Sequence, residues 1–78
     1  MHVYILQSIA VADRYYIGVT SDLETRLERH NGGQCKHTAK FRPWQMDTAI
    51  AFRCRDKALA FEKYLKSHSG RAFAKKHF

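Results

Sequence analysis

A chain of 78 residues with 45% hydrophobic side chains can fold as one domain with a small core, and it leaves no room for a second domain. Its formal charge of +7 is unevenly placed. Residues 1–33 carry three Arg against four acidic residues, whereas residues 34–78 carry eleven Lys and Arg against three. Such an excess attracts polyanions, but charge alone does not separate a nucleic-acid partner from a basic surface that only keeps a protein in solution.

The composition also excludes several classes of protein. The apolar run from Val3 to Leu6 is far shorter than a signal segment or a membrane span, so no membrane segment is expected. The two cysteines, Cys35 and Cys54, have no metal-ligand spacing and are expected to be free thiols. We therefore expect one folded unit over residues 1–78 in a reducing cytoplasm.

Two segments near the N-terminus alternate with a period of two residues, which is typical of strands. They are His2–Gln7 and Tyr15–Thr20, and the polar stretch between them predicts a hairpin. Tyr4 and Tyr16 would then share one face of the sheet, while Tyr15 on the opposite face is expected to pack. A glycine inside a strand often marks the close approach of another group, which is the expectation for Gly18.

The first helix is predicted to begin within Thr20–Glu24, with a hydroxyl cap, and to continue to about His30. Arg26 and His30 are four residues apart and project from one flank of this helix. That flank can face the two tyrosines.

The second half of the chain is predicted to contain a polar, cationic loop over 34–43, a strand over 44–52 and two helices, at 57–66 and 71–77. In the strand we expect Trp44, Met46, Ile50 and Phe52 to point inward on a single face. Asp56 is expected to cap the first of these helices and Ser69-Gly70 the second. Glu62 lies beside the apolar stripe of the first, and a carboxylate there requires a cation, a metal or hydrogen bonds.

The chain resembles GIY-YIG nuclease domains, of the small stand-alone UvrC-like kind, over nearly its whole length. The matches, in chain order, are Val3-Tyr4-Ile5-Leu6, Tyr15-Tyr16-Ile17-Gly18-Val19-Thr20, Asp22-Leu23, Arg26-Leu27, His30-Asn31-Gly32, Lys36-His37-Thr38, Arg42-Pro43, Lys57-Ala58-Leu59, Glu62-Lys63 and Lys66. Each match is weak alone, but their order and spacing are specific. The resemblance implies an α/β (α+β) domain, with a three-stranded antiparallel sheet flanked by about three helices.

The resemblance further implies hydrolysis of DNA phosphodiester bonds, with water attacking phosphorus in line and the 3′ oxygen leaving. Tyr4 is the candidate base, assisted by His30, and Tyr16 would orient the phosphate or the nucleophile. Arg26 would stabilise charge that develops on the phosphoryl oxygens. Glu62 would hold one Mg²⁺, with Mn²⁺ as an alternative, because such a cation keeps several waters and needs few protein ligands.

The expected substrate is duplex, branched or single-stranded DNA, cut according to structure rather than sequence in repair or recombination. The candidate DNA contacts are Thr20, Asn31, Lys36, Thr38, Lys40, Arg42, Lys63 and Lys66. A role at a bacterial nucleoid would suit this function. Nothing in the sequence fixes the oligomeric state.

Each candidate has an ordinary structural alternative when it is taken singly. Tyr4 and Tyr16 could be half-buried strand aromatics, Arg26 and His30 a solvated helix face, and Glu62 a salt-bridge partner of Lys66. Two other functions also remain open: a nucleic-acid-binding module without turnover, and a small basic protein that accompanies RNA. We favour the endonuclease because the set occurs together and in order.

Overall fold

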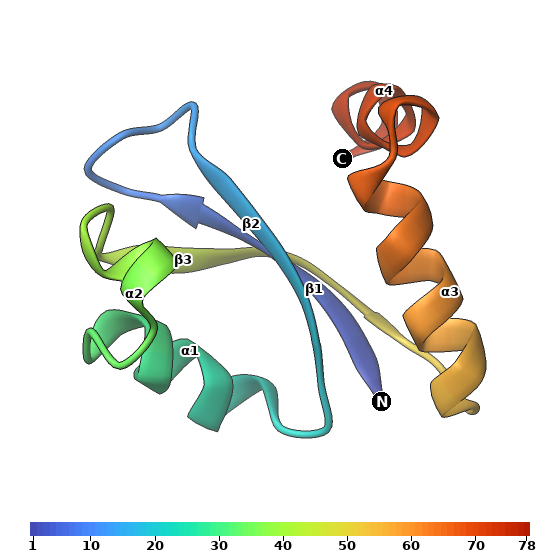
Figure 1. The fold of residues 1–78 in the computed structure, drawn as a ribbon, viewed down its shortest axis with the longest axis horizontal. Helices are drawn as coiled ribbons and strands as arrows, with labels where there is room; N and C mark the ends of the chain where they lie inside the picture. Colours follow the sequence, from blue (N-terminus) through green and yellow to red (C-terminus); the bar gives the residue numbers. More distant parts are fainter.

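Three antiparallel strands and four helices make up the fold, which the computed structural model describes from Met1 to Phe78. The strands are β1 (His2–Ser8), β2 (Tyr15–Thr20) and β3 (Trp44–Ala51), and the sheet order is β2-β1-β3. The helices are α1 (Leu23–Asn31), the four-residue α2 (Lys36–Ala39), α3 (Arg55–Lys66) and α4 (His68–His77). Figure 1 shows α1 and α2 on one side of β2 and α3 and α4 on the other. The predicted α+β class and three-stranded antiparallel sheet are confirmed.

The predicted hairpin is confirmed, and its register places alternate residues of β1 on two separate cores. Tyr4 pairs with Gly18 and Leu6 with Tyr16, so these side chains face α1. Val3 and Ile5 lie on the opposite face, packed with Ala58 and Leu65 of α3. The central strand therefore separates a core beneath α3 and α4 from a second core beneath α1.

The expectation that the third strand has one inward face is wrong. The pairing of β1 with β3 shifts by one residue between Ile5 and Leu6, so that Asp47 is the extra residue of a bulge. Because side chains alternate along a strand, this one residue moves Met46 and Trp44 to the α1 side and leaves Ile50 on the α3 side. Trp44 is buried as expected, but not in the same core as Phe52.

The start of α1 is fixed by a carboxylate and not by the predicted hydroxyl. Asp22 accepts hydrogen bonds from the backbone N–H and the hydroxyl of Thr25, at 3.1 and 2.9 Å. These bonds hold the pKa of the Asp22 carboxyl below its ordinary value. The Thr20 hydroxyl instead bonds both backbone polar groups of Asp22 at 3.1 Å, so the residue forms the turn that precedes the helix.

The caps of α3 and α4 also differ from those predicted. Asp56 lies in the first turn of α3, where the N-cap residue Cys54 makes no side-chain cap. Ser67 ends α3 and caps α4 by accepting a hydrogen bond from Gly70 N–H at 3.1 Å, the role expected of Ser69. A Cβ on Gly70 would overlap the Tyr64 carbonyl group, so the missing side chain permits the tight α3–α4 junction.

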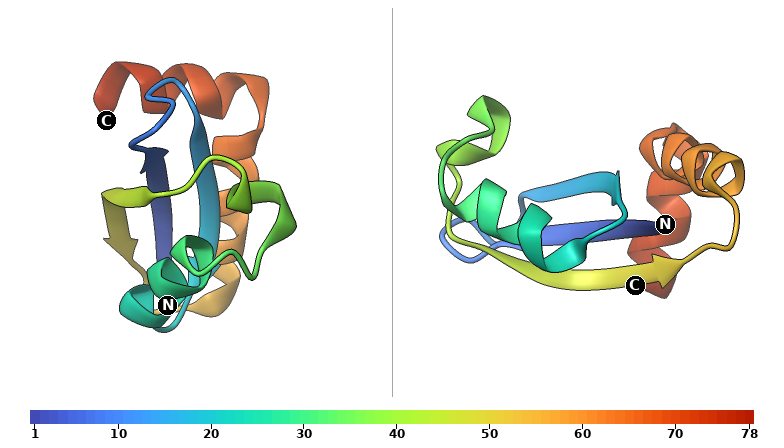
Figure 2. Two further views of the ribbon diagram at one scale, coloured as in Figure 1. Left: turned by 90° about the vertical axis from the view of Figure 1, so that its left-hand side faces the viewer. Right: turned by 90° about the horizontal axis from the view of Figure 1, so that it is seen from below.

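The α3–α4 pair places α4 at the same end of the molecule as the β1–β2 loop, as Figure 1 and the left view of Figure 2 show. Tyr15 is 56% exposed, so the expectation that it packs is wrong. Both cysteines are free, as predicted. None of the helices has the length and apolar character required to cross a membrane.

Candidate active site

A chain of three buried side chains lies between the sheet and α1. The Tyr4 hydroxyl lies 3.1 Å from Nε2 of His30, and Nδ1 of His30 lies 2.8 Å from the Thr38 hydroxyl. The three residues are 1%, 2% and 2% exposed. The hydroxyl of Thr38 lies 3.3 Å from the Cys35 carbonyl oxygen, to which it can donate its hydrogen. The chain Tyr4–His30–Thr38–Cys35 therefore connects β1, α1 and the start of α2.

One tautomer of His30 satisfies all of these contacts. If Thr38 donates to the Cys35 carbonyl, its hydroxyl oxygen is free to accept from Nδ1–H of His30. Nε2 then has a lone pair, which accepts the hydrogen of the Tyr4 hydroxyl. We assign this tautomer because every polar atom of the chain then has a complementary partner.

Gly18 provides the space that the Tyr4 ring occupies. A Cβ on Gly18 would overlap the Tyr4 hydroxyl, and it would lie 2.6 Å from Cζ and 2.9 Å from Cε1 of the same ring. The predicted close approach to Gly18 is therefore made by Tyr4 from the paired strand. The absence of a side chain at this position is what allows the phenol to reach His30.

Tyr16 and Arg26 extend the group toward solvent. The Tyr16 ring lies 4.7 Å from the His30 ring and 6.3 Å from the Tyr4 ring, measured between centroids. A hollow of about 240 Å³ opens beside them. It is lined by Tyr16, Arg26, Arg29, His30, Gln34 and Cys35. Two guanidinium groups at one small hollow favour an anionic ligand such as a phosphate.

Burial changes the acidity of both members of the Tyr4–His30 pair. It raises the pKa of Tyr4 to about 12, the neighbouring Tyr16 adds to the rise, and the charge of Arg26 opposes it. Burial also lowers the pKa of His30, and the charge of Arg26 lowers it further. At neutral pH the pair therefore consists of a protonated phenol and an uncharged imidazole.

Glu62 does not join this group. It lies on α3, the helix that packs on the opposite face of β1, and no hydrogen bond or ion pair links it to Tyr4, Tyr16, Arg26 or His30. Its side chain is 22% exposed, and its carboxylate pairs with the Lys66 ammonium at 3.3 Å, one turn further along the helix. No three His, Cys, Asp or Glu side chains gather as a metal-binding group. Of the five catalytic candidates, the structure brings together four.

Three of the candidate DNA contacts have their polar atoms engaged inside the protein. The side-chain amide of Asn31 both accepts from and donates to the backbone of Trp44, which fixes the start of β3. Thr38 orients His30, and Thr20 forms the turn before α1. The geometry gives these three residues structural roles, and it offers no support for their expected contacts with nucleic acid.

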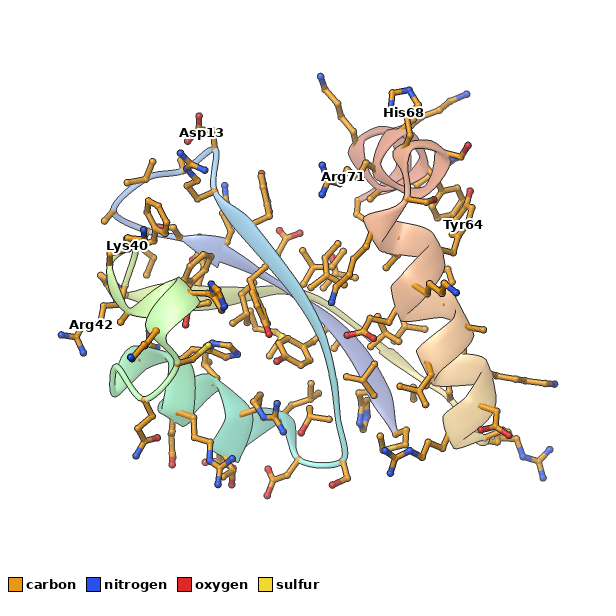
Figure 3. The ribbon with its side chains drawn as sticks, in the orientation of Figure 1. Asp13, Lys40, Arg42, Tyr64, His68 and Arg71 are labelled. Atoms are coloured by element: carbon orange, nitrogen blue, oxygen red, sulfur yellow. The ribbon has the colours of Figure 1, made fainter.

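The cationic candidates are exposed: Lys36, Lys40, Arg42, Lys63 and Lys66. Figure 3 shows Lys40 and Arg42 at the loop after α2, and the Arg42 guanidinium lies next to Gly33, where a Cβ would overlap it. The predicted loop over 34–43 is not irregular throughout, because Lys36–Ala39 within it forms the short helix α2. Two features of the site were not predicted from the sequence. Arg29 lines the hollow, and its spacing of three residues from Arg26 on α1 could have indicated this. The hydrogen bond between Thr38 and His30 was also not predicted.

A sequence model described as the GIY-YIG catalytic domain matches residues 1–76, and the chain belongs to the GIY-YIG family. This match covers the tyrosine group, the α1 residues and Glu62.

Curated relatives include structure-specific endonuclease subunits SLX1 of fungi. The subunit of Talaromyces marneffei is 45% identical over 65 residues, which is 76% of this chain and 17% of that protein. The subunit of Candida dubliniensis is 44% identical over 71 residues, which is 82% of this chain and 25% of that protein. The subunit of Debaryomyces hansenii is 38% identical over 71 residues, which is 82% of this chain and 20% of that protein. The chain thus spans a quarter or less of the length of these relatives.

Proposed function

We propose that this domain is a divalent-metal-dependent endonuclease that hydrolyses DNA phosphodiester bonds. The observation that carries the proposal is the buried Tyr4–His30–Thr38 chain beside Tyr16 and Arg26, in a chain of the GIY-YIG family. Packing alone does not account for three buried side chains that are linked by hydrogen bonds, because buried polar groups add little net stability.

In this proposal the Tyr4–His30 pair removes the proton from the attacking water. A phenol with a pKa raised to about 12 is a weak acid, so it needs a partner that accepts its proton as the water attacks. Nε2 of His30 is positioned for this at 3.1 Å, and the lowered pKa of His30 keeps the imidazole neutral and able to accept. Thr38 then holds the imidazole in the required tautomer.

Tyr16 and Arg26 act on the phosphate. Both line the hollow, where a phosphoryl group can lie against the Arg26 guanidinium. The positive charge of Arg26 would stabilise the negative charge that develops on the phosphoryl oxygens during in-line attack. Tyr16 donates a hydrogen bond that holds the phosphate or the water in line. Arg29, from the same hollow, adds a second cation for the neighbouring phosphate.

The residues present fit one divalent cation that keeps most of its water ligands. Glu62 is the carboxylate that the family resemblance assigns to the metal, its side chain is partly exposed, and its partner is the exposed ammonium of Lys66. The lack of a three-ligand group argues against Zn²⁺ or a fully protein-bound Ca²⁺. We therefore propose Mg²⁺, with Mn²⁺ as an alternative. When bound, such a cation would neutralise charge on the departing oxygen.

The substrate proposed here is DNA recognised by its structure. A domain with principal extents of 29 × 25 × 17 Å offers few elements for reading bases, so shape and phosphates dominate its contacts. The fungal relatives are named structure-specific endonuclease subunits, which supports a role in repair or recombination. A cytoplasmic site of action belongs to this proposal.

One observation favours a second candidate function, a nucleic-acid-binding module without turnover. Glu62 pairs with Lys66 and makes no hydrogen bond or ion pair with the four clustered residues. If the only role of Glu62 is its ion pair with Lys66 on α3, the domain holds no metal. The basic surface and the hollow would then bind phosphates without cleaving DNA.

The two candidates are separated by nicking of a supercoiled plasmid, followed by a panel of duplex, flapped, branched and single-stranded oligonucleotides. The endonuclease should nick with Mg²⁺, stop in EDTA and cut branched DNA faster than plain duplex. Binding to the same oligonucleotides without metal-dependent cleavage of any of them would leave the binding module as the function.

A further inference from the structure

A second and larger hollow lies on the other side of Tyr16, between the β1–β2 hairpin and α4. We call it the hairpin–α4 groove; its volume is about 1060 Å³. One wall is formed by the end of the β1–β2 loop and the start of β2, the other by α4 and the end of α3. Figure 3 shows Arg71 projecting from α4 toward the hairpin, whose loop carries Asp13. None of the catalytic roles proposed above uses this groove.

Cations line the groove on both walls. Arg14 belongs to the hairpin, Lys66 to α3, and Arg71 and Lys75 to α4, against the two acids Asp13 and Asp47. Arg14 is oriented by the Phe41 ring, over which its guanidinium carbon lies at 4.9 Å from the centroid. Cations on opposite walls of one groove suit a polyanion that runs along it.

Aromatic rings are exposed in the same groove. Tyr15 is 56% exposed and Phe78 is 46% exposed, although both are large and apolar. The Tyr15 hydroxyl accepts a hydrogen bond from Nε2 of Gln7 at 3.2 Å, and that nitrogen also donates to the Ala12 carbonyl oxygen at 2.8 Å. The Tyr15 hydroxyl is therefore anchored while more than half of the residue remains exposed. A fixed, open ring among cations is the arrangement that stacks an unpaired base.

The groove is continuous with the proposed active site. Tyr16 lines both hollows, and Lys66 lines the groove while pairing with Glu62. A strand in the groove would therefore pass Tyr16 at one end and lie close to the acid proposed to hold the metal.

We infer that the hairpin–α4 groove binds a single-stranded DNA segment, whose phosphates contact Arg71 and Lys75 and one of whose bases stacks on Tyr15. Single-stranded DNA is favoured over duplex because only unpaired bases expose the ring face that Tyr15 can stack on. Where the domain cuts branched DNA, the groove receives the unpaired arm next to the cleaved phosphate. This last role rests on the proposed endonuclease function, whereas the binding itself does not.

The binding is tested by fluorescence anisotropy with a labelled oligothymidine of about ten nucleotides, in EDTA. Tyr15→Ala should weaken binding about fivefold or more, the loss expected for one stacked base. Its matched control is Tyr64→Ala, which removes an aromatic ring that is 41% exposed and lies outside the groove, and this should change affinity little. Equal effects of the two substitutions would overturn the inference.

A second pair tests the phosphate contacts on one helix. Lys75 lines the groove, and its neighbour Lys76 on α4 does not. Lys75→Ala should reduce the slope of log affinity against log salt by about 0.7, and Lys76→Ala should leave it nearly unchanged. Equal reductions of this slope in the two variants would show that binding depends on net charge and not on contacts within the groove. Tighter binding of a structured RNA than of oligothymidine, with the same dependence on Tyr15, would also overturn the choice of single-stranded DNA.

The result is independent of cleavage. If the wild-type protein binds oligothymidine through Tyr15 but cuts nothing with Mg²⁺, the groove stands and the endonuclease proposal fails. If it cuts with Mg²⁺ while Tyr15→Ala binds as the wild type does, the groove fails and the endonuclease stands.

Discussion

Gly18→Ala perturbs the site through packing alone, without removing any catalytic candidate. The added methyl would overlap the Tyr4 hydroxyl and crowd two further ring atoms at 2.6 and 2.9 Å. Since the Tyr4 ring is 1% exposed, it has no free space to move into. It must shift away from His30, and the hydrogen bond at 3.1 Å is lost.

The free energy of unfolding should fall by about 1–3.6 kcal/mol in Gly18→Ala. Overpacking a close-packed site costs about 1–3 kcal/mol, and the lost Tyr4–His30 hydrogen bond adds about 1 kcal/mol. The reduced freedom of the unfolded chain returns about 0.4–1 kcal/mol. In a domain of this size Tm should drop by about 4–8 °C for each kcal/mol. Cleavage should fall by about 10²-fold at unchanged DNA affinity, because a displacement near 1 Å suffices for that loss.

The stability loss is measured by urea unfolding followed by the fluorescence of Trp44, the single tryptophan, which is 4% exposed. Repeating the measurement with Gly18→Ala in a Tyr4→Phe background supplies the control. Removing the hydroxyl relieves the closest overlap, so the glycine substitution should cost less there, with a coupling of about 0.5 kcal/mol or more. Wild-type stability in Gly18→Ala, or the same loss in both backgrounds, would refute the reasoning.

Three further predictions follow from the site and the basic loop. As pH falls below the ordinary His30 pKa of 6.5, the unfolded chain takes up a proton that the folded protein, with its lowered pKa, does not. The contribution of His30 to the free energy of unfolding is therefore complete above pH 6.5, and the free energy should fall by up to about 1.4 kcal/mol per pH unit below it. If the free energy of unfolding of His30→Gln fell equally steeply with pH, this would contradict the prediction. Tyr4→Phe should abolish cleavage while DNA affinity stays at the wild-type value, and Tyr16→Phe should only slow cleavage. If single-turnover rates show a greater loss in Tyr16→Phe than in Tyr4→Phe, Tyr16 is the base. Lys40→Ala and Arg42→Ala should each lower the salt dependence of duplex binding by about 0.9 in log–log slope, and unchanged slopes would exclude them as phosphate contacts.

Local patterns in the sequence were sufficient for most of the fold. The period of two in the first two strands predicted the hairpin and the shared face of Tyr4 and Tyr16, because alternation fixes a face once pairing is known. The spacing of four residues likewise placed Arg26 and His30 on one flank of α1. The family match extends from the first strand into α4, in agreement with the resemblance drawn from the motifs.

The features that failed depend on tertiary contacts. The bulge at Asp47 reverses the face of half a strand, and alternation in the sequence cannot show where pairing slips by one residue. The role of Thr38 depends on where a short helix brings its hydroxyl, and a sequence pattern does not encode that position. For Glu62, the ordinary alternative weighed at the start, an ion pair with Lys66, is the contact that the structure contains.

The central claim is that Glu62 and the Tyr4–His30 group serve one reaction, although α3, which carries Glu62, packs on the other face of β1 from Tyr4. The most direct measurement compares Glu62→Gln with the wild type in Mg²⁺, as single-turnover cleavage and DNA affinity on one branched oligonucleotide. We expect cleavage to be lost while affinity stays the same or rises slightly, because a carboxylate that repels phosphate has been neutralised. Cleavage at the wild-type rate in Glu62→Gln would contradict the account and remove Glu62 from the active site.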